Sequence, residues 1–199
     1  MTRSPILLGI MVFALAAGSI VLCAADKPES SATTKPVVDS SPSTSDTRVQ
    51  SLKGYTYAFV SAETTLTTLH DTIDQLVPKL DTAMDAGQLR VEGVAIFTYH
   101  GATMDPSKKF TLDVGIIVKD GSTAPPGFTI AVVPAATNAT LLYTGNMQGL
   151  PPAYGKLYGE ITRQGLQPTD VSREVYLYWE GVDSPNNVVQ LRAELSAGL

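Results

Sequence analysis

The sequence predicts an α+β domain made of two pseudo-symmetric β-α-β-β halves with antiparallel sheets. Two observations predict this fold. Apolar residues recur at helical spacing in residues 66–84 and 153–161, and the segments around them alternate between apolar and polar residues. Clusters of Gly, Pro and Asn separate these segments, as expected for turns. The order strand, helix, strand, strand therefore occurs twice, which is typical of an antiparallel sheet with helices on one face.

The N-terminal residues 1–25 differ from this domain, because they are apolar and Arg3 is their only charged residue. A basic start, an apolar run of about fifteen residues and small residues at 23–25 are typical of a signal peptide. The apolar run is also long enough for an uncleaved membrane anchor. A lipid anchor on Cys23 is a third alternative, although the residue before a lipidated cysteine is normally small and Leu22 is large. We expect an exported, periplasmic or envelope-associated protein that meets a membrane only through this segment.

The following residues, 26–50, are rich in Ser, Thr, Pro, Lys and Asp, and Val37, Val38 and Val49 are their only large aliphatic residues. Such a segment buries too little apolar surface to offset the loss of chain entropy on folding. We therefore expect a disordered linker over 26–50 and one domain over 51–199.

In the first half, residues 55–62 predict a strand, and the apolar positions between Leu66 and Met84 predict a helix that Gly87 ends. Pro78 lies within this pattern and is expected to kink or divide the helix. Residues 94–100 and 110–118 predict the next two strands.

In the second half, residues 128–135 and 140–144 predict an extended segment that is interrupted near Asn138. A helix follows, which Gly165 ends, and then residues 173–180 and 188–195 predict two paired strands. Two such halves form a groove along their junction, which is a natural ligand site.

Composition excludes several kinds of site. One cysteine excludes an internal disulfide, and His70 and His100 lack companions at the spacing of a metal site. The net charge is −5 and the pI about 4.9, which argues against a nucleic-acid partner. We expect no metal and no cofactor, and we interpret His100 as a turn or surface histidine rather than a haem ligand.

Four phrases carry a family resemblance. They are Phe110-Thr-Leu-Asp-Val-Gly115-Ile, Leu142-Tyr-Thr-Gly145, Ala153-Tyr154-Gly-Lys-Leu157 and Arg173-Glu174-Val-Tyr176-Leu. In this order the chain resembles the GyrI-like small-molecule-binding domain, also called the AraC-type effector-binding domain, whose fold is related to the SOUL haem-binding group. The resemblance covers residues 51–195. It implies a bacterial small-molecule binder, since family members serve as effector modules of multidrug-responsive regulators, as hydrolases of strained natural products, or as partners of proteins such as gyrase.

Glu174 is the main candidate ligand-binding residue. Strand alternation places it on one face with Tyr176, Tyr178 and Glu180, and places Trp179 on the opposite face. A carboxylate beside phenol rings suits a flat or cationic organic ligand, and the resemblance implies that Glu174 is the buried acid of the pocket. The alternative is a solvated glutamate paired with Arg173 or Arg192.

Three further tyrosines are candidate ligand-binding residues. The resemblance implies that Tyr154 reaches toward the pocket from the second helix, while ordinary core packing is its alternative. Tyr143 precedes Gly145, and Tyr99 ends a strand of the first half. We expect Gly115 and Gly145 to have backbone roles rather than chemical ones: each allows a close approach of another chain segment or a positive φ.

Three functions remain open at this point. The first is an exported protein that binds an apolar or cationic small molecule at Glu174. The second is a hydrolase in which Glu174 activates water and Tyr154 or Tyr143 assists. The third is an envelope module for protein–protein interaction.

Overall fold

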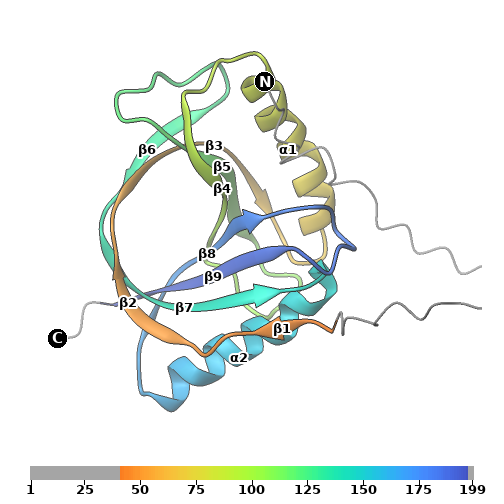
Figure 1. Ribbon diagram of the computed structural model, residues 1–199, viewed down its shortest axis with the longest axis vertical. Coiled ribbons are helices and arrows are strands. Elements are labelled where there is room, and N and C mark those ends of the chain that lie inside the picture. The colour runs from red at the N-terminus through yellow and green to blue at the C-terminus, as the bar shows by residue number, and fades with distance from the viewer. Residues whose placement is uncertain (1–40, 197–199) are drawn as a thin grey trace, which may run out of the picture.

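The computed structural model describes residues 41–196, and it has the predicted α+β fold (Figure 1). The elements in chain order are β1 (Ser43–Thr44), β2 (Arg48–Leu52), β3 (Tyr55–Thr64), α1 (Leu69–Asp85), β4 (Val91–His100), β5 (Phe110–Val118), β6 (Thr129–Val133), β7 (Ala136–Thr144), a 3-10 turn η1 (Met147–Gly149), α2 (Leu150–Arg163), β8 (Pro168–Tyr178) and β9 (Val188–Leu195). Neither α1 nor α2, the α-helices of residues 41–196, combines the length and the hydropathy that a bilayer span requires.

The strands form one nine-stranded sheet in which every pairing is antiparallel. Its main order is β1-β7-β9-β8-β4-β5-β3-β6, and β2 also pairs with β7. The halves β3-α1-β4-β5 and β7-α2-β8-β9 have the same internal order, and β4 pairs with β8 at the junction between them. The predicted doubling of the fold is therefore confirmed.

The sheet curls until its two ends meet. Leu52 lies opposite Ala136 in the ladder of β2 with β7, and Tyr55 lies opposite Val133 in the ladder of β3 with β6. The two ladders share one register, so β2–β3 and β6–β7 run side by side as two long bent strands. Figure 1 shows this curl on the left of the molecule. The sheet thus has an inner face and a face that carries the helices.

Both helices pack on the same face of the sheet. Helix α1 contacts β3 and β5, and α2 contacts β7 and β9. The helices contribute Leu76, Leu80, Leu157 and Ile161, among others, to one continuous core. Helix α1 continues through Pro78 from Leu69 to Asp85, so Pro78 does not divide it, because packing of the apolar stripe against the sheet outweighs one lost backbone hydrogen bond.

Two predicted boundaries differ from the structure. Strand β1 and the first three residues of β2 lie within the predicted linker 26–50, and both strands pair with β7, so the sheet begins before residue 51. The break in the second extended segment falls at 134–135 rather than near Asn138, since Pro134 has no N–H for a sheet ladder. The predicted signal segment, 1–25, and the first part of the predicted linker, 26–40, lie outside the described residues.

Candidate functional site

Glu174 lies at the centre of the fold, on the face of the sheet that carries the helices. It belongs to β8 and lies opposite Phe97 of β4 and Leu191 of β9. Alternation along β8 places Tyr176 on the same face. Because β4 and β8 pair at the junction of the two halves, Glu174 lies between the halves.

Three tyrosines surround the Glu174 carboxylate. The Tyr154 hydroxyl of α2 donates a hydrogen bond of 3.0 Å to Oε1, and the Tyr176 hydroxyl donates one of 2.6 Å to Oε2. The Tyr99 hydroxyl, from β4, also acts on the carboxylate as a donor. We call Glu174, Tyr99, Tyr154 and Tyr176 the glutamate–tyrosine cluster.

The carboxylate is buried without a cation beside it. Only 5% of Glu174 is exposed, and among the ion pairs of residues 41–196 none involves it. Burial raises the pKa of Glu174 above its ordinary value, and the hydrogen bonds from the three phenols limit that rise. Burial and the nearby carboxylate raise the pKa of each of the three phenols, so they remain donors.

Aromatic rings extend this cluster. The Tyr176 ring packs against Phe97 with centroids 4.8 Å apart, and it forms a T-shaped pair with Trp179 with centroids 5.5 Å apart. Tyr154 stacks near Tyr158, with centroids 6.4 Å apart. A buried carboxylate can balance the charge of an organic cation, and aromatic rings nearby can supply cation–π contacts.

Two of the tyrosines predicted for the site lie elsewhere. The Tyr143 hydroxyl donates to the Asn146 carbonyl, and Tyr143 lies two strands from Tyr176 across Val189. Tyr178 is 49% exposed, and its hydroxyl donates to Glu180. A register shift between Tyr176 and Tyr178 interrupts the alternation, so Tyr178 lies opposite Val188, on the other face. The prediction that Tyr178 shares the face of Glu174 is therefore wrong.

The alternative of a solvated glutamate is also wrong. Glu174 pairs with neither Arg173 nor Arg192, because both arginines project from the opposite face of the sheet. Arg173 instead contacts Glu194, with Nη1 and Oε2 2.9 Å apart.

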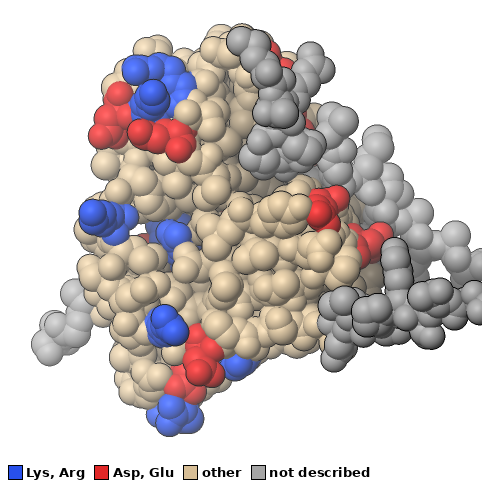
Figure 2. Space-filling view, viewed as in Figure 1, with Lys and Arg blue, Asp and Glu red and all other residues tan. Residues whose placement is uncertain are grey.

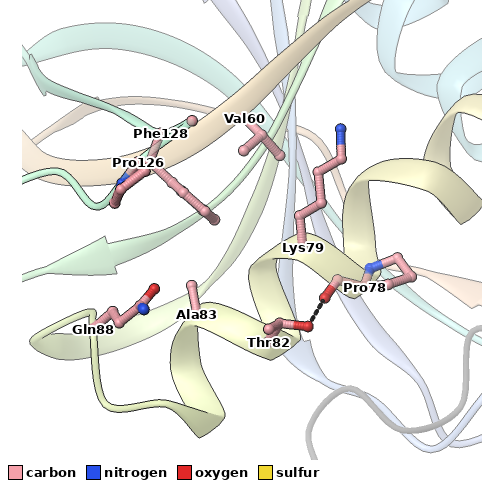
Figure 3. Close-up of a pocket in the computed structure, with 9 residues that line it drawn as sticks. Val60, Pro78, Lys79, Thr82, Ala83, Gln88, Pro126 and Phe128 are labelled. Atoms are coloured by element: carbon pink, nitrogen blue, oxygen red, sulfur yellow. Dashed lines mark hydrogen bonds between the residues drawn. The ribbon is translucent and has the colours of Figure 1, made fainter.

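A shallow cleft of about 520 Å³ lies apart from Glu174, between the C-terminal half of α1 and the loop before β6 (Figure 3). Its lining residues are Val60, Pro78, Lys79, Thr82, Ala83, Gln88, Pro126, Gly127 and Phe128. Figure 3 shows Lys79 and Phe128 on opposite sides of the cleft. This cleft could not be predicted from the sequence, because the loop and the helix are distant in sequence and neither carries a motif.

A polar group that the sequence does not predict lies on the inner face of the sheet. Asp113 of β5 accepts hydrogen bonds from His100 at 2.7 Å, Ser61 at 2.5 Å and Tyr57 at 3.1 Å. The only sequence signal was an aspartate within an otherwise apolar strand. His100 ends β4 and its side chain is 39% exposed, which agrees with its interpretation as a surface or turn histidine, and Asp113 is its buried hydrogen-bond partner. No group of three or more potential metal ligands gathers in the described part of the chain.

Comparison with protein families gives one match. Residues 45–191 match the GyrI-like small molecule binding domain. A comparison with curated proteins finds no match.

Several solved structures share the fold. The C-terminal domain of EcmrR is similar with a TM-score of 0.63 and 18% identity, over 76% of this chain and 97% of that domain. EcmrR in a complex with DNA is similar with a TM-score of 0.62 and 17% identity. The match spans 76% of this chain but only 57% of that longer chain. SAV2435 bound to tetraphenylphosphonium is similar with a TM-score of 0.56 and 8% identity, over 76% of this chain and 94% of that chain. A hydrolase from Listeria innocua is similar with a TM-score of 0.51 and 8% identity, over 76% of this chain and 92% of that chain.

Proposed function

The chain belongs to the family of GyrI-like small-molecule-binding domains, and from this premise we propose that it binds an apolar organic cation at the glutamate–tyrosine cluster. The observation that carries the proposal is the burial of Glu174 without a cationic partner among the described residues. A buried unpaired carboxylate is costly for folding, and a bound cation would remove that cost. The tetraphenylphosphonium in SAV2435 is a ligand of this kind in a protein of the same fold.

Tyr154 is the residue that would open the site. Both carboxylate oxygens of Glu174 are occupied by phenols, so a ligand must displace at least one of them. Tyr176 and Tyr99 are buried within the core, whereas Tyr154 is only partly buried and comes from α2 rather than from the sheet. A rotation of the Tyr154 side chain would therefore expose Oε1 with the least disturbance of the core.

Binding of tetraphenylphosphonium to the purified full chain tests this proposal, and its neutral analogue triphenylphosphine oxide tests the role of charge. The variant Glu174→Gln removes the charge and keeps the shape. We expect it to lose about 2 kcal/mol or more of binding free energy for the cation, roughly thirtyfold in affinity, and little for the neutral analogue. The matched control is Glu180→Gln, which removes an exposed charge near the end of the same strand segment.

The pH dependence gives a second readout. Protonation neutralises Glu174, so the affinity for the cation should fall as the pH falls through the pKa of Glu174, which burial raises. Equal affinity of Glu174→Gln and the wild type for tetraphenylphosphonium, at every pH, would exclude this site as the cation site.

The hydrolase is the second candidate function. The direct hydrogen bond between Tyr154 and Glu174 favours it, because a base and a proton donor stand within reach of one substrate. In this role Glu174 would take a proton from water as the water oxygen bonds to a carbon of the strained ring. The strained carbon–carbon bond would break, the leaving carbon would take the proton of the Tyr154 hydroxyl, and Glu174 would return its proton to Tyr154. Turnover of a strained electrophile that is lost in Glu174→Gln, and reduced in Tyr154→Phe, would favour hydrolysis over binding alone.

We further propose that the protein acts outside the cytoplasm, on the basis of the charge and apolar pattern of residues 1–25. Fractionation of cells that express the full chain tests this. Recovery in the periplasmic or membrane fraction would support export, and recovery in the cytosol would contradict it.

A further inference from the structure

The inner face of the sheet carries a second group of polar side chains, opposite to the helices and to Glu174. The continuous core under the helices does not include the buried residues of this face, such as Ile96 and Val175. We call its polar members around β8 and β9 the arginine cluster. They are Tyr55, Asn138, Arg173, Gln190, Arg192 and Glu194.

Two arginines lie side by side in this cluster. Arg173 of β8 and Arg192 of β9 are directly opposite each other in the ladder, so their side chains share the inner face. Glu194 pairs with Arg173, whereas the Arg192 Nε donates to the Gln190 side-chain oxygen at 2.7 Å. The cluster thus contains two cations and one carboxylate, and that carboxylate pairs with Arg173.

Asp113 also lies on the inner face, but it does not balance the second arginine. It is two strands from Arg173, across Thr98. Its oxygens already accept hydrogen bonds from His100, Ser61 and Tyr57. Positive charge therefore remains in excess around Arg192.

Two donors in the cluster are buried and unused. Arg173 is 8% exposed, and within residues 41–196 its Nε has no hydrogen-bond partner. The Tyr55 hydroxyl is likewise buried and has no partner in this part of the chain. The Asn138 side-chain oxygen is also buried without a partner among the described residues, so it accepts from neither donor. A buried donor without an acceptor costs about 1–3 kcal/mol, so the Arg173 Nε and the Tyr55 hydroxyl indicate that a further acceptor belongs in the cluster.

We propose that Arg173, Arg192 and Tyr55 bind a small oxyanion, the phosphate or carboxylate group of a small molecule. The planar fork of a guanidinium matches both groups through two parallel hydrogen bonds. The site is not sealed, because 26% of the Glu194 side chain is exposed and Arg192 is only partly buried. Figure 2 shows a hollow at the left edge of the molecule with Lys and Arg atoms at its rim, on the side where Figure 1 places β2 and β6.

The electrostatics agree with this assignment. Burial lowers the pKa of Arg192, and although the Tyr55 phenol opposes this, the charge of Arg173 lowers that pKa as well. Burial raises the pKa of the Tyr55 hydroxyl, while the charges of Arg173 and Arg192 lower it and the charge of Glu194 raises it. A bound anion would stabilise the charge of both arginines.

Calorimetric titration of the full chain tests the proposal, with inorganic phosphate in one arm, acetate in another and chloride at equal ionic strength as the blank. We expect phosphate or acetate to bind above the blank, and the better of the two identifies the oxyanion. Arg192→Gln should weaken that binding roughly tenfold or more. Arg192 has no carboxylate partner, so this variant should remain folded. Arg90→Gln, which removes an exposed charge, is the matched control and should bind as the wild type does.

The side-chain N–H resonance of Arg173 gives an independent readout, and phosphate should shift it in the wild type. Binding no stronger than the chloride blank, or equal binding by Arg192→Gln and the wild type, would overturn the proposal. Tetraphenylphosphonium binding should be unchanged in Arg192→Gln, since Glu174 lies on the other face. The two proposals therefore fail independently.

Discussion

At the scale of single residues, Glu174 is held in an environment that opposes its charge. Burial favours the neutral acid, and only phenol hydroxyls compensate the carboxylate. The residue therefore reduces the stability of the folded protein at neutral pH, as groups kept for binding often do. This cost should be measurable without knowledge of the ligand.

We expect Glu174→Gln to be at least as stable as the wild type at about pH 7, with the advantage shrinking near pH 4. The pKa of Glu174 is raised above its ordinary 4.5 in the folded state. The folded state therefore binds more protons than the unfolded state above about pH 4.5, and wild-type stability falls as the pH rises through the folded pKa. Urea unfolding at both pH values, followed by Trp179 fluorescence, measures the difference between the two proteins.

The contribution of Asp113 to stability has the opposite pH dependence to that of Glu174, but it does not affect the comparison of the two proteins. Burial alone would raise its pKa, yet hydrogen bonds from His100, Ser61 and Tyr57 lower it overall. The stability that Asp113 contributes is present above its unfolded pKa and is lost as the pH falls. Both proteins contain Asp113, so its effect cancels in the difference. A stability difference that is the same at both pH values would mean that Glu174 does not titrate as a buried acid.

At the scale of elements, Gly115 allows two strands to approach closely. It lies in the centre of β5, opposite Phe59 of β3. An added Cβ would lie 2.7 Å from the Phe59 Cβ and would also overlap the Ala58 carbonyl. The predicted role of Gly115, a close backbone approach, agrees with this geometry.

We expect Gly115→Ala to lower the free energy of unfolding by about 1–3 kcal/mol, because the strands cannot separate without loss of packing. The matched control is Gly159→Ala in α2, where an added Cβ meets no atom within 4 Å. That change should raise stability by about 0.5–1 kcal/mol, since alanine favours a helix. Chemical denaturation measures both, and equal effects of the two changes would show that the approach at Gly115 is not tight.

The strands and helices of the doubled unit could be predicted from periodicity because each depends on local sequence. Tyr99, Tyr154, Tyr176 and Glu174, which the structure brings together, also came from that pattern together with the family phrases. Tyr178 could not be placed, because the register shift after Tyr176 depends on the partner strand β9 rather than on the sequence of β8. The pairing of Arg173 with Arg192 on the inner face could not be predicted, since alternation assigns a residue to one face of a strand but does not show which residues of other strands lie beside it.

At the scale of the whole molecule, closure of the sheet depends on residues that the sequence assigns to a linker. Strand β2 pairs with β7 from Arg48 to Leu52, and β1 extends the same edge. Local composition could not reveal this, because polar residues can form an edge strand when a partner strand lies elsewhere in the chain. Lys156 of α2 also fixes this segment, since its Nζ lies 2.9 Å from both the Thr44 hydroxyl and the Ser45 carbonyl oxygen.

We therefore expect a chain that begins at residue 51 to be less stable than one that begins at residue 41. The shorter chain loses β1 and most of β2, a handful of backbone hydrogen bonds worth about 1 kcal/mol each, so its free energy of unfolding should be about 2–4 kcal/mol lower. It also exposes the edge of β7, which should promote association between molecules. Urea unfolding and size-exclusion chromatography of the two chains measure these effects. Restoring residues 41–50 with Lys156→Gln should give intermediate stability, whereas equal stability of the two chains would mean that the domain closes without β1 and β2.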